Sequence, residues 1–479
     1  MSSETVIQTD ALARLDNMPW TRFHTTMTLA LGVGWALDSF ETNMIGSMFG
    51  IIKAQWRLSS LQSSLAVTVW LCGMLIGAIA FGYLADRFGR KRLFLGTLVW
   101  YVVFSVGTVF SWNYESFLFF RIMTALAVGG EYSAVTAAMG ELVPKSHRGR
   151  TDTFILSGFP LGALLSAGAS WLLIAYLPAE LSWRIGFGLG AALAIIFVWV
   201  RRVVPESPRW LLQQGRIAEV ETIVERIAEK ARQEGHSTQA DRRYQAVAFA
   251  PERPDFLGNL RDLFGQYRWR CALASAFNFS QATVVYGVLV LMGLVVLPYL
   301  KVPASDVPIY YLFGNVAALL GGLAAAHTIE AWGRRRSLLA SYSLAVLAIL
   351  PLCALTNLPV AVVSYCMIQF GVTWAYISAY VVSSEVLPTR IRATGLGVSV
   401  AVGRAGAMIA PFLLTSAYQF TGTPVLALIV LMALALPGPI AAALWWRNGL
   451  ETRNVSLEEG SAETVRLSKT GKFEEALAL

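Results

Sequence analysis

Apolar stretches of twenty or more residues follow one another along almost the whole sequence. As a helix, each stretch is long enough to cross a hydrocarbon core about 30 Å thick. Only 14% of the 479 residues are charged, whereas a soluble domain carries about 25%. The sequence therefore predicts an all-α protein that crosses the lipid bilayer many times.

We predict about twelve transmembrane helices, centred near Leu37, Leu71, Phe104, Val128, Leu165, Ala192, Leu289, Leu319, Val346, Trp374, Ile409 and Val430. Lys and Arg gather in the loops after the second, fourth, eighth and tenth spans. Because basic loops stay on the cytoplasmic side, both termini are expected in the cytoplasm. Residues 1–20 are polar and mixed in charge, so no signal peptide is expected.

Two loop sequences each occur twice in the chain, and the distance between the copies is the same for both. "GYLADRFGRKR" (82–92) aligns with "AHTIEAWGRRR" (326–336), and "ELVPKSHRG" (141–149) aligns with "EVLPTRIRA" (385–393). The shift is 244 in both cases (326 − 82 and 385 − 141). Such a repeat predicts two six-helix pseudo-symmetric halves, with a substrate site between them near the membrane midplane.

The repeat divides the chain into four parts. We predict an N-terminal half at 1–204, a cytoplasmic linker at 205–270, a C-terminal half at 271–447 and a cytoplasmic tail at 448–479. In the linker, "RIAEVETIVERIAEKARQEG" places apolar residues at helical spacing, which predicts an amphipathic helix at the membrane surface. A solvated linker that braces the inner face is the alternative.

Several classes of function are disfavoured. The net charge of +8 comes from the loops that orient the spans, so no nucleic-acid partner is expected. Cys72, Cys271, Cys353 and Cys366 fall in or beside spans and indicate buried thiols. No phosphate-binding loop, metal-ligand cluster or catalytic set of histidines is present, which predicts no cofactor, no metal and no enzyme.

The repeated loop motif, "RGR" at 148–150 and "PESPRWLL" at 205–212 together resemble the major facilitator superfamily along the whole chain. "GWALDSFETNMIG" and "RATGLGVSVAVGRAGAMIAP" are most similar to bacterial niacin transporters and their synaptic-vesicle and organic-anion relatives. The sequence departs from sugar porters, because "FNFSQATVVYGVLVL" and "SGFPLGALL" lack most of their glutamine signatures.

Asp38 and Glu41 are the only charged residues from Thr25 to Ile52, although a charge at mid-membrane costs about 2.5–3.5 kcal/mol. They share one helix face, and mutual repulsion and desolvation favour a protonated carboxyl. The sugar-porter resemblance implies that Glu41 pairs with Arg121 and that protonation of Glu41 releases this pair. A fixed ion pair that only stabilises the bundle is the alternative.

Arg404 is the one charge in an otherwise apolar eleventh span. Paired N–H donors suit a substrate carboxylate, and an intramembrane Arg is expected to meet an anion. The organic-anion resemblance implies that Arg404 binds an anionic substrate. Alternatively, it caps helix carbonyls or pairs with an acid from another span.

The remaining candidates are ring-stacking, hydrogen-bonding and gating residues. We expect substrate contacts from Trp35, Tyr286, Trp374, Tyr380, Asn278 and Gln281, although packing explains each as well. Glu131 is a further proton-coupling candidate, or a structural buried acid. A cytoplasmic gate of loop ion pairs is expected at Asp86, Arg90, Glu141, Arg148, Glu330, Arg334, Glu385 and Arg392.

These features predict a secondary active transporter, monomeric and resident in the plasma (bacterial inner) membrane. It would take up a small aromatic or organic carboxylate, such as nicotinate, together with protons by alternating access. The alternatives are a proton-coupled sugar or organic-cation transporter, or a membrane sensor on the same fold that transports nothing.

Overall fold

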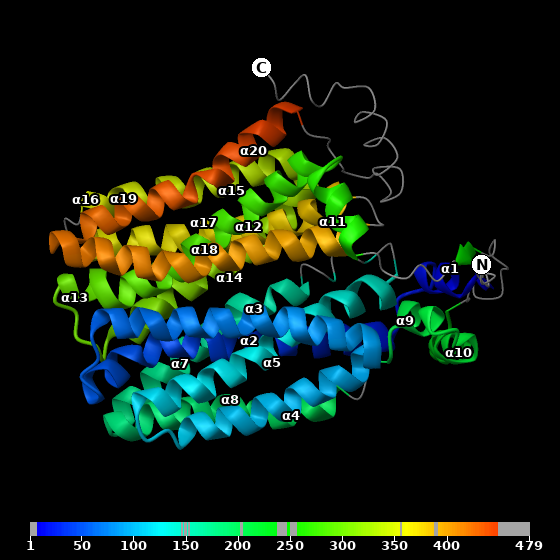
Figure 1. The fold of residues 1–479 in the computed structure, drawn as a ribbon, viewed down its shortest axis with the longest axis horizontal. Coiled ribbons are helices and arrows are strands. Elements are labelled where there is room, and N and C mark those ends of the chain that lie inside the picture. Colours follow the sequence, from blue (N-terminus) through cyan, green and yellow to red (C-terminus); the bar gives the residue numbers. More distant parts are fainter. Residues whose placement is uncertain are drawn as a thin grey trace. The chain divides into compact units, whose positions relative to one another are not determined.

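Long helices dominate the computed structural model, which describes residues 7–144, 147, 151, 154–201, 205–236, 247–249, 256–354, 357–387 and 391–448. The N-terminal elements are β1 (Ile7–Thr9), α1 (Ala11–Asp16), α2 (Arg22–Gln55), α3 (Ser60–Phe88), α4 (Arg90–Val109), α5 (Tyr114–Leu142), α7 (Gly158–Tyr176) and α8 (Ala179–Arg201). The linker elements are α9 (Pro208–Gln213), α10 (Ile217–Gln233), β2 (Val247–Phe249) and α11 (Phe256–Phe264). Figure 1 shows the ribbon coloured along the chain.

The later elements include several helices that break within one span. They are α12 (Arg268–Leu291), the π-helical turn η2 (Met292–Val296), α13 (Leu297–Tyr299), α14 (Val307–Ala331), α15 (Arg334–Leu347), α16 (Ile349–Ala354), α17 (Leu358–Val386), α18 (Arg392–Thr421), α19 (Pro424–Ala435) and α20 (Pro437–Asn448). Among the described residues, nine helical stretches are long and apolar enough to cross a membrane. With α2, α5 and α8 they give the twelve predicted spans.

The chain forms two compact units. Unit 1 holds Met1–Asp38, Gly73–Phe159 and Phe187–Asp255, and unit 2 holds Ser39–Cys72, Pro160–Gly186 and Phe256–Leu479. The borders fall inside α2, α3, α7 and α8, so each of these helices supplies a segment to both units. The predicted four-part division follows the spans instead and stays a prediction.

The repeat of 244 positions is visible in the helix packing. A Cβ added at Gly77 would lie 2.0 Å from the carbonyl oxygen of Leu126, and one at Gly321 would lie 2.2 Å from that of Phe370. Both members of the second pair are 244 residues after those of the first. Glycine is required in α3 and α14 because no side chain fits where these helices meet α5 and α17.

The same repeat appears where two helices begin. Gly89 before α4 and Gly333 before α15 both have positive φ, 96° and 84°, a conformation that glycine adopts without strain. They are again 244 positions apart. The basic residues that follow each glycine therefore start a helix in both copies of the motif.

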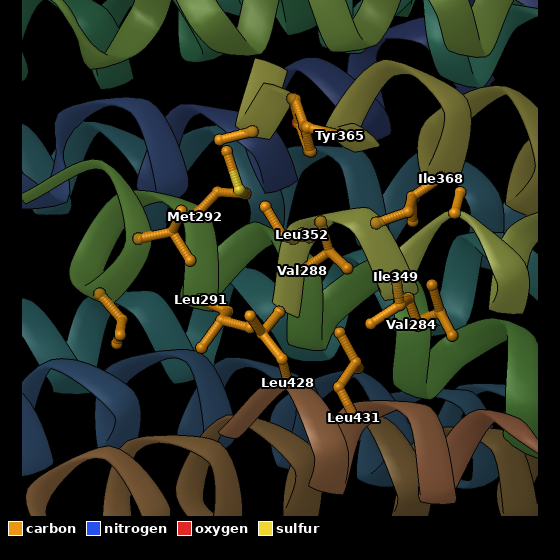
Figure 2. Close-up of a cluster of buried hydrophobic side chains, with 14 of the residues drawn as sticks. Val284, Val288, Leu291, Met292, Ile349, Leu352, Tyr365, Ile368, Leu428 and Leu431 are labelled. Atoms are coloured by element: carbon orange, nitrogen blue, oxygen red, sulfur yellow. The ribbon is translucent and has the colours of Figure 1, made fainter. Parts of the chain in front are cut away.

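A large apolar core cluster lies in unit 2, separate from two smaller clusters that contain Phe277 and Leu387. Buried side chains from α12, η2, α16, α17 and α19 pack together, among them Val284, Val288, Leu291, Met292, Ile349, Leu352, Tyr365, Ile368, Leu428 and Leu431 (Figure 2). The π-helical turn is held by Tyr311 of α14, whose hydroxyl donates to the carbonyl oxygen of Leu289 at 2.5 Å. Burial of this cluster fixes the packing of the α12 segment that follows Tyr286.

The predicted amphipathic helix is α10, and its apolar stripe is buried in the protein. Val220, Val224 and Ile227 are at most 2% exposed, and α10 packs against α1 and α9. Arg14 of α1 forms an ion pair with Glu221, and the backbone N–H of Arg22 donates to Glu234 at 3.0 Å. The apolar face of this helix is therefore covered by α9 and by the N-terminal segment of the same chain.

A two-stranded sheet joins the N-terminus to the linker. Strands β1 and β2 are antiparallel, with Ile7 opposite Phe249 and Thr9 opposite Val247. Three-residue strands are too short to leave an alternating pattern in the sequence, so this pairing was not predicted.

Candidate functional site

Arg404 lies on a distinct face of α18. Exposed apolar residues, such as Val402, Ile409 and Phe412, occupy the face suited to lipid. A second face packs closely on α12, where a Cβ added at Gly403 would lie 2.8 Å from the carbonyl oxygen of Asn278. Arg404, Met408 and Thr415 share the third face, since residues four and seven positions apart align on a helix.

Tyr286 of α12 holds Arg404 in place. The guanidinium Nη1 donates to the Tyr286 hydroxyl at 2.8 Å, and the Arg404 Cζ lies 5.8 Å from the centre of the ring. Tyr286 is 6% exposed, whereas Arg404 is partly exposed. Helices α12 and α18 pack side by side over this region (Figure 1). The structure thus brings together two of the predicted substrate-binding residues.

Asn278 and Gln281 lie on the same helix as Tyr286, and both are partly exposed. The amide nitrogen of Asn278 donates to the carbonyl oxygen of Ala274 at 3.0 Å. Asn278 is eight residues before Tyr286, which places it about 12 Å away along the helix. The Asn278 amide therefore keeps only its oxygen and one N–H for another partner, and its substrate contact stays a prediction.

Trp374 belongs to a buried polar network. Its indole N–H donates to the Ser337 hydroxyl at 2.8 Å, and that hydroxyl also lies 3.1 Å from Thr328 and 3.0 Å from Ser378. The network joins α14, α15 and α17, and its members are at most 6% exposed. This geometry gives the Trp374 indole a structural partner, and its stacking on a substrate stays a prediction. Tyr380, further along α17, is partly exposed.

Three of the four charged residues predicted to couple protons have described side chains, and all three are buried. On α2, Asp38 is 7% exposed and Glu41 is 0% exposed, and nearby Trp35 is 1% exposed. Arg121 of α5 is also 0% exposed, and its Cζ lies 4.7 Å from the ring centre of Phe187. Such groups inside a membrane helix favour a functional role. Pairing between Glu41 and Arg121 stays a prediction.

Most of the predicted cytoplasmic gate lies outside the described residues. Arg148 is among the positions that the structure does not describe, and the same holds for the side chains of Asp86, Arg90, Glu141, Glu330, Glu385 and Arg392. The side chain of Glu131, the further proton-coupling candidate, is also outside the description. Arg334 is described and is 8% exposed, with Nη1 3.5 Å from the carbonyl oxygen of Ile329. The gate therefore stays a prediction.

Glu206 makes a contact that was not predicted from the sequence. Its carboxylate accepts from the backbone N–H of Lys91 at 3.1 Å and lies over Gly89 at the start of α4. A carboxylate at a helix N-terminus satisfies unpaired N–H groups and the helix dipole. The motif "PESPRWLL" contains Glu206, so the signal was present in the sequence, but its partner was not evident.

Uncharged contacts between α3 and α18 were also missed. The hydroxyls of Ser64 and Thr415 lie 2.7 Å apart, and Thr68 donates to the carbonyl oxygen of Met408 at 3.1 Å. The sulfur atoms of Cys72 and Met408 are 4.0 Å apart. Hydroxyl and sulfur side chains are common in apolar helices, so the sequence alone did not single them out.

The described site is suited to binding a polar ligand. No group of three or more His, Cys, Asp or Glu side chains suited to a metal occurs within the part of the chain that the structure describes. Arg404 and Tyr286 together present N–H and O–H donors beside apolar surface. This combination can bind and orient a small molecule with acceptor oxygens.

Known proteins resemble this chain over most of its length. The niacin transporter NiaP of Acinetobacter baylyi is 28% identical over 409 residues, which cover 85% of this chain and 90% of that protein. A probable 4-methylmuconolactone transporter of Cupriavidus pinatubonensis is 36% identical over 174 residues, covering 36% of this chain and 41% of that protein.

A similar solved structure is the proton:xylose symporter XylE of E. coli, bound to 6-bromo-6-deoxy-D-glucose. It has a TM-score of 0.72 and 19% identity, and the match covers 92% of this chain and 99% of XylE. This likeness confirms the predicted twelve-helix fold.

The model of the "Sugar (and other) transporter" family matches residues 25–461. The chain therefore belongs to this transporter family of the major facilitator superfamily.

Proposed function

We propose that this transporter takes up a small aromatic or organic carboxylate, such as nicotinate, together with protons. The hydrogen bond between Arg404 and Tyr286 is the observation that carries the proposal. It places a guanidinium and a phenol on facing helices of unit 2, beside apolar residues. A carboxylate accepts well from both groups.

The direction of the hydrogen bond explains why both residues take part. The Tyr286 oxygen accepts from Arg404, so its own proton remains available for another acceptor. One carboxylate oxygen accepts from Arg404 and the other from Tyr286. Because the pair is already hydrogen-bonded, little side-chain entropy is lost when the anion binds.

The relatives support a small organic substrate. The related Acinetobacter protein is a niacin transporter, and the Cupriavidus relative is described as a probable 4-methylmuconolactone transporter. A ring that carries an oxygen acceptor is common to both compounds. Nicotinate unites this ring with the carboxylate that Arg404 favours.

Proton coupling is proposed for the buried charges of α2 and α5. Asp38 and Glu41 are buried on α2, and a carboxyl group can bind and release a proton. In this proposal Glu41 carries the coupled proton and Arg121 responds to its change of charge, which would couple proton binding to the movement of helices. XylE, which has the same fold, is a proton:xylose symporter.

An organic-cation or sugar carrier is the main alternative. Relatives include an organic cation/carnitine transporter of Arabidopsis thaliana, 25% identical over 433 residues. A partly buried Arg404 repels a cationic substrate, and a sugar offers it no charge to bind. For this reason the carboxylate is the better fit.

We further propose a monomer in the plasma membrane with both termini in the cytoplasm.

Purified protein in detergent provides a direct test. Nicotinate and benzoate should raise its melting temperature, whereas nicotinamide and choline should not, because a ligand stabilises only the form that it binds. Arg404→Ala should abolish the shift, and the exposed Arg447→Ala should keep it. A shift with choline but not with nicotinate, or an undiminished shift in Arg404→Ala, would overturn the proposal.

A further inference from the structure

The face of α18 that carries Arg404 continues onto a pair of sulfur atoms. Met408 is four residues after Arg404, one turn away and about 6 Å along the helix. Its Sδ lies 4.0 Å from the Sγ of Cys72 on α3. Both residues belong to unit 2, as does Arg404.

Beyond the sulfur pair, hydrogen-bonding side chains join the two helices. Ser64, Thr68 and Cys72 are spaced by four and form one face of α3. Thr68 donates to the carbonyl oxygen of Met408, and Thr415 donates to the carbonyl oxygen of Pro411 at 2.7 Å. The hydroxyls of Ser64 and Thr415 lie within hydrogen-bond distance of each other. These bonds fix α3 against α18 along this face.

Burial changes along this contact. Ser64 and Thr415 are 0% exposed at one end, whereas Cys72, Met408 and Arg404 at the other end are partly exposed. Ser64 and Thr415 form the closed end, Thr68 is already partly exposed, and the sulfur pair lies on the accessible part of this contact. A molecule bound to Arg404 therefore has the sulfur atoms as its neighbours toward the closed end.

We propose that Met408 and Cys72 form a subsite for the aromatic ring of the substrate. The inference rests on the proposed carboxylate role of Arg404 and adds a determinant of selectivity to it. Thioether and thiol sulfur atoms are polarisable and make favourable contacts with aromatic rings. A flat ring whose carboxylate is held by Arg404 packs against these sulfur atoms, and an aliphatic chain gains less from them.

Competition against labelled nicotinate uptake tests the subsite. Met408→Leu conserves volume but removes the sulfur, and it should reduce the preference for benzoate over butyrate by about threefold to tenfold. Met367→Leu, at an exposed position of α17, is the matched control and should leave the preference unchanged. An unchanged preference in Met408→Leu would overturn the inference.

A thiol probe tests the ring subsite without changing Met408 or Cys72. In a variant whose only cysteine is Cys72, nicotinate should slow alkylation by N-ethylmaleimide at least threefold more than butyrate does at equal occupancy of the protein. Equal protection by the two acids would contradict a ring subsite. If Arg404→Ala still transports nicotinate normally, the proposed function itself fails, whatever the alkylation rates show.

Discussion

Ser280 of α12 donates a hydrogen bond of 2.6 Å to the carbonyl oxygen of Ala435 at the break between α19 and α20. In a continuous helix this oxygen would accept from the backbone of residue 439, but Pro439 has no N–H. Ser280 replaces the missing donor. Nearby Gly438 leaves room for Ser280 and Tyr342, since an added Cβ would lie 2.4 and 2.3 Å from their side chains.

Ser280→Ala should lower the free energy of unfolding by about 1–3 kcal/mol, because it leaves a buried carbonyl oxygen without a donor. Thermal unfolding of the purified variant measures this effect. Ser305→Ala removes a hydroxyl from an exposed loop and should change the stability little. Equal stability of the two variants would show that another donor replaces Ser280.

Tyr286→Phe should weaken nicotinate binding about tenfold to a hundredfold. The substitution removes the hydroxyl that accepts from Arg404, and hydrogen bonds to charged groups contribute about 1.5–3 kcal/mol. The KM for uptake into proteoliposomes is the measurement. Tyr176→Phe, at a position 81% exposed, provides the control, and an unchanged KM in Tyr286→Phe would remove this residue from the site.

Gly321→Ala should destabilise the protein by about 1–3 kcal/mol, because the new methyl group would overlap the backbone of Phe370. Gly397→Ala is a matched control on α18, since a Cβ there meets no heavy atom within 4 Å. Alanine has the higher helix propensity, so the control should be neutral or slightly more stable. Similar melting temperatures for the two variants would contradict the close approach of α14 and α17.

The sequence predicts the parts of this structure that follow from membrane burial and from the repeat. Apolar length indicates the spans, and the shift of 244 relates Gly77 to Gly321 and Gly89 to Gly333. Asp38, Glu41 and Arg404 are identified as candidate functional residues because charges are costly in lipid.

Other features depend on tertiary contacts that leave no local signal. The partner of Glu206 is the start of a helix more than a hundred residues earlier. The Ser64–Thr415 contact joins two hydroxyls among many in the chain. The partner of the Trp374 indole N–H is Ser337, which has no periodic or charge signature in the sequence.

Glu206→Ala should shorten the lifetime of the linker contact with α4. The variant loses the carboxylate that accepts from the Lys91 N–H, and such helix-capping contacts contribute about 1 kcal/mol. Hydrogen exchange at the N–H groups of residues 91–93 should therefore become about fivefold faster. Glu219→Ala removes an exposed ion pair of α10 and should leave this exchange unchanged. If exchange in Glu206→Ala matches that of wild type, the carboxylate does not cap α4 in solution.

Glu41→Gln should separate substrate movement from proton coupling. The amide has nearly the same shape as a protonated carboxyl but cannot lose a proton, so the variant would stay in the protonated-like state. Counterflow exchange of nicotinate between the two sides of a proteoliposome should continue, because it needs no net proton transfer. Accumulation driven by an inward proton gradient should disappear. Glu115→Gln, an exposed change in the first turn of α5, should preserve both activities. If Glu41→Gln accumulates nicotinate as wild type does, the proton is carried elsewhere, and Asp38→Asn should be tested in the same way.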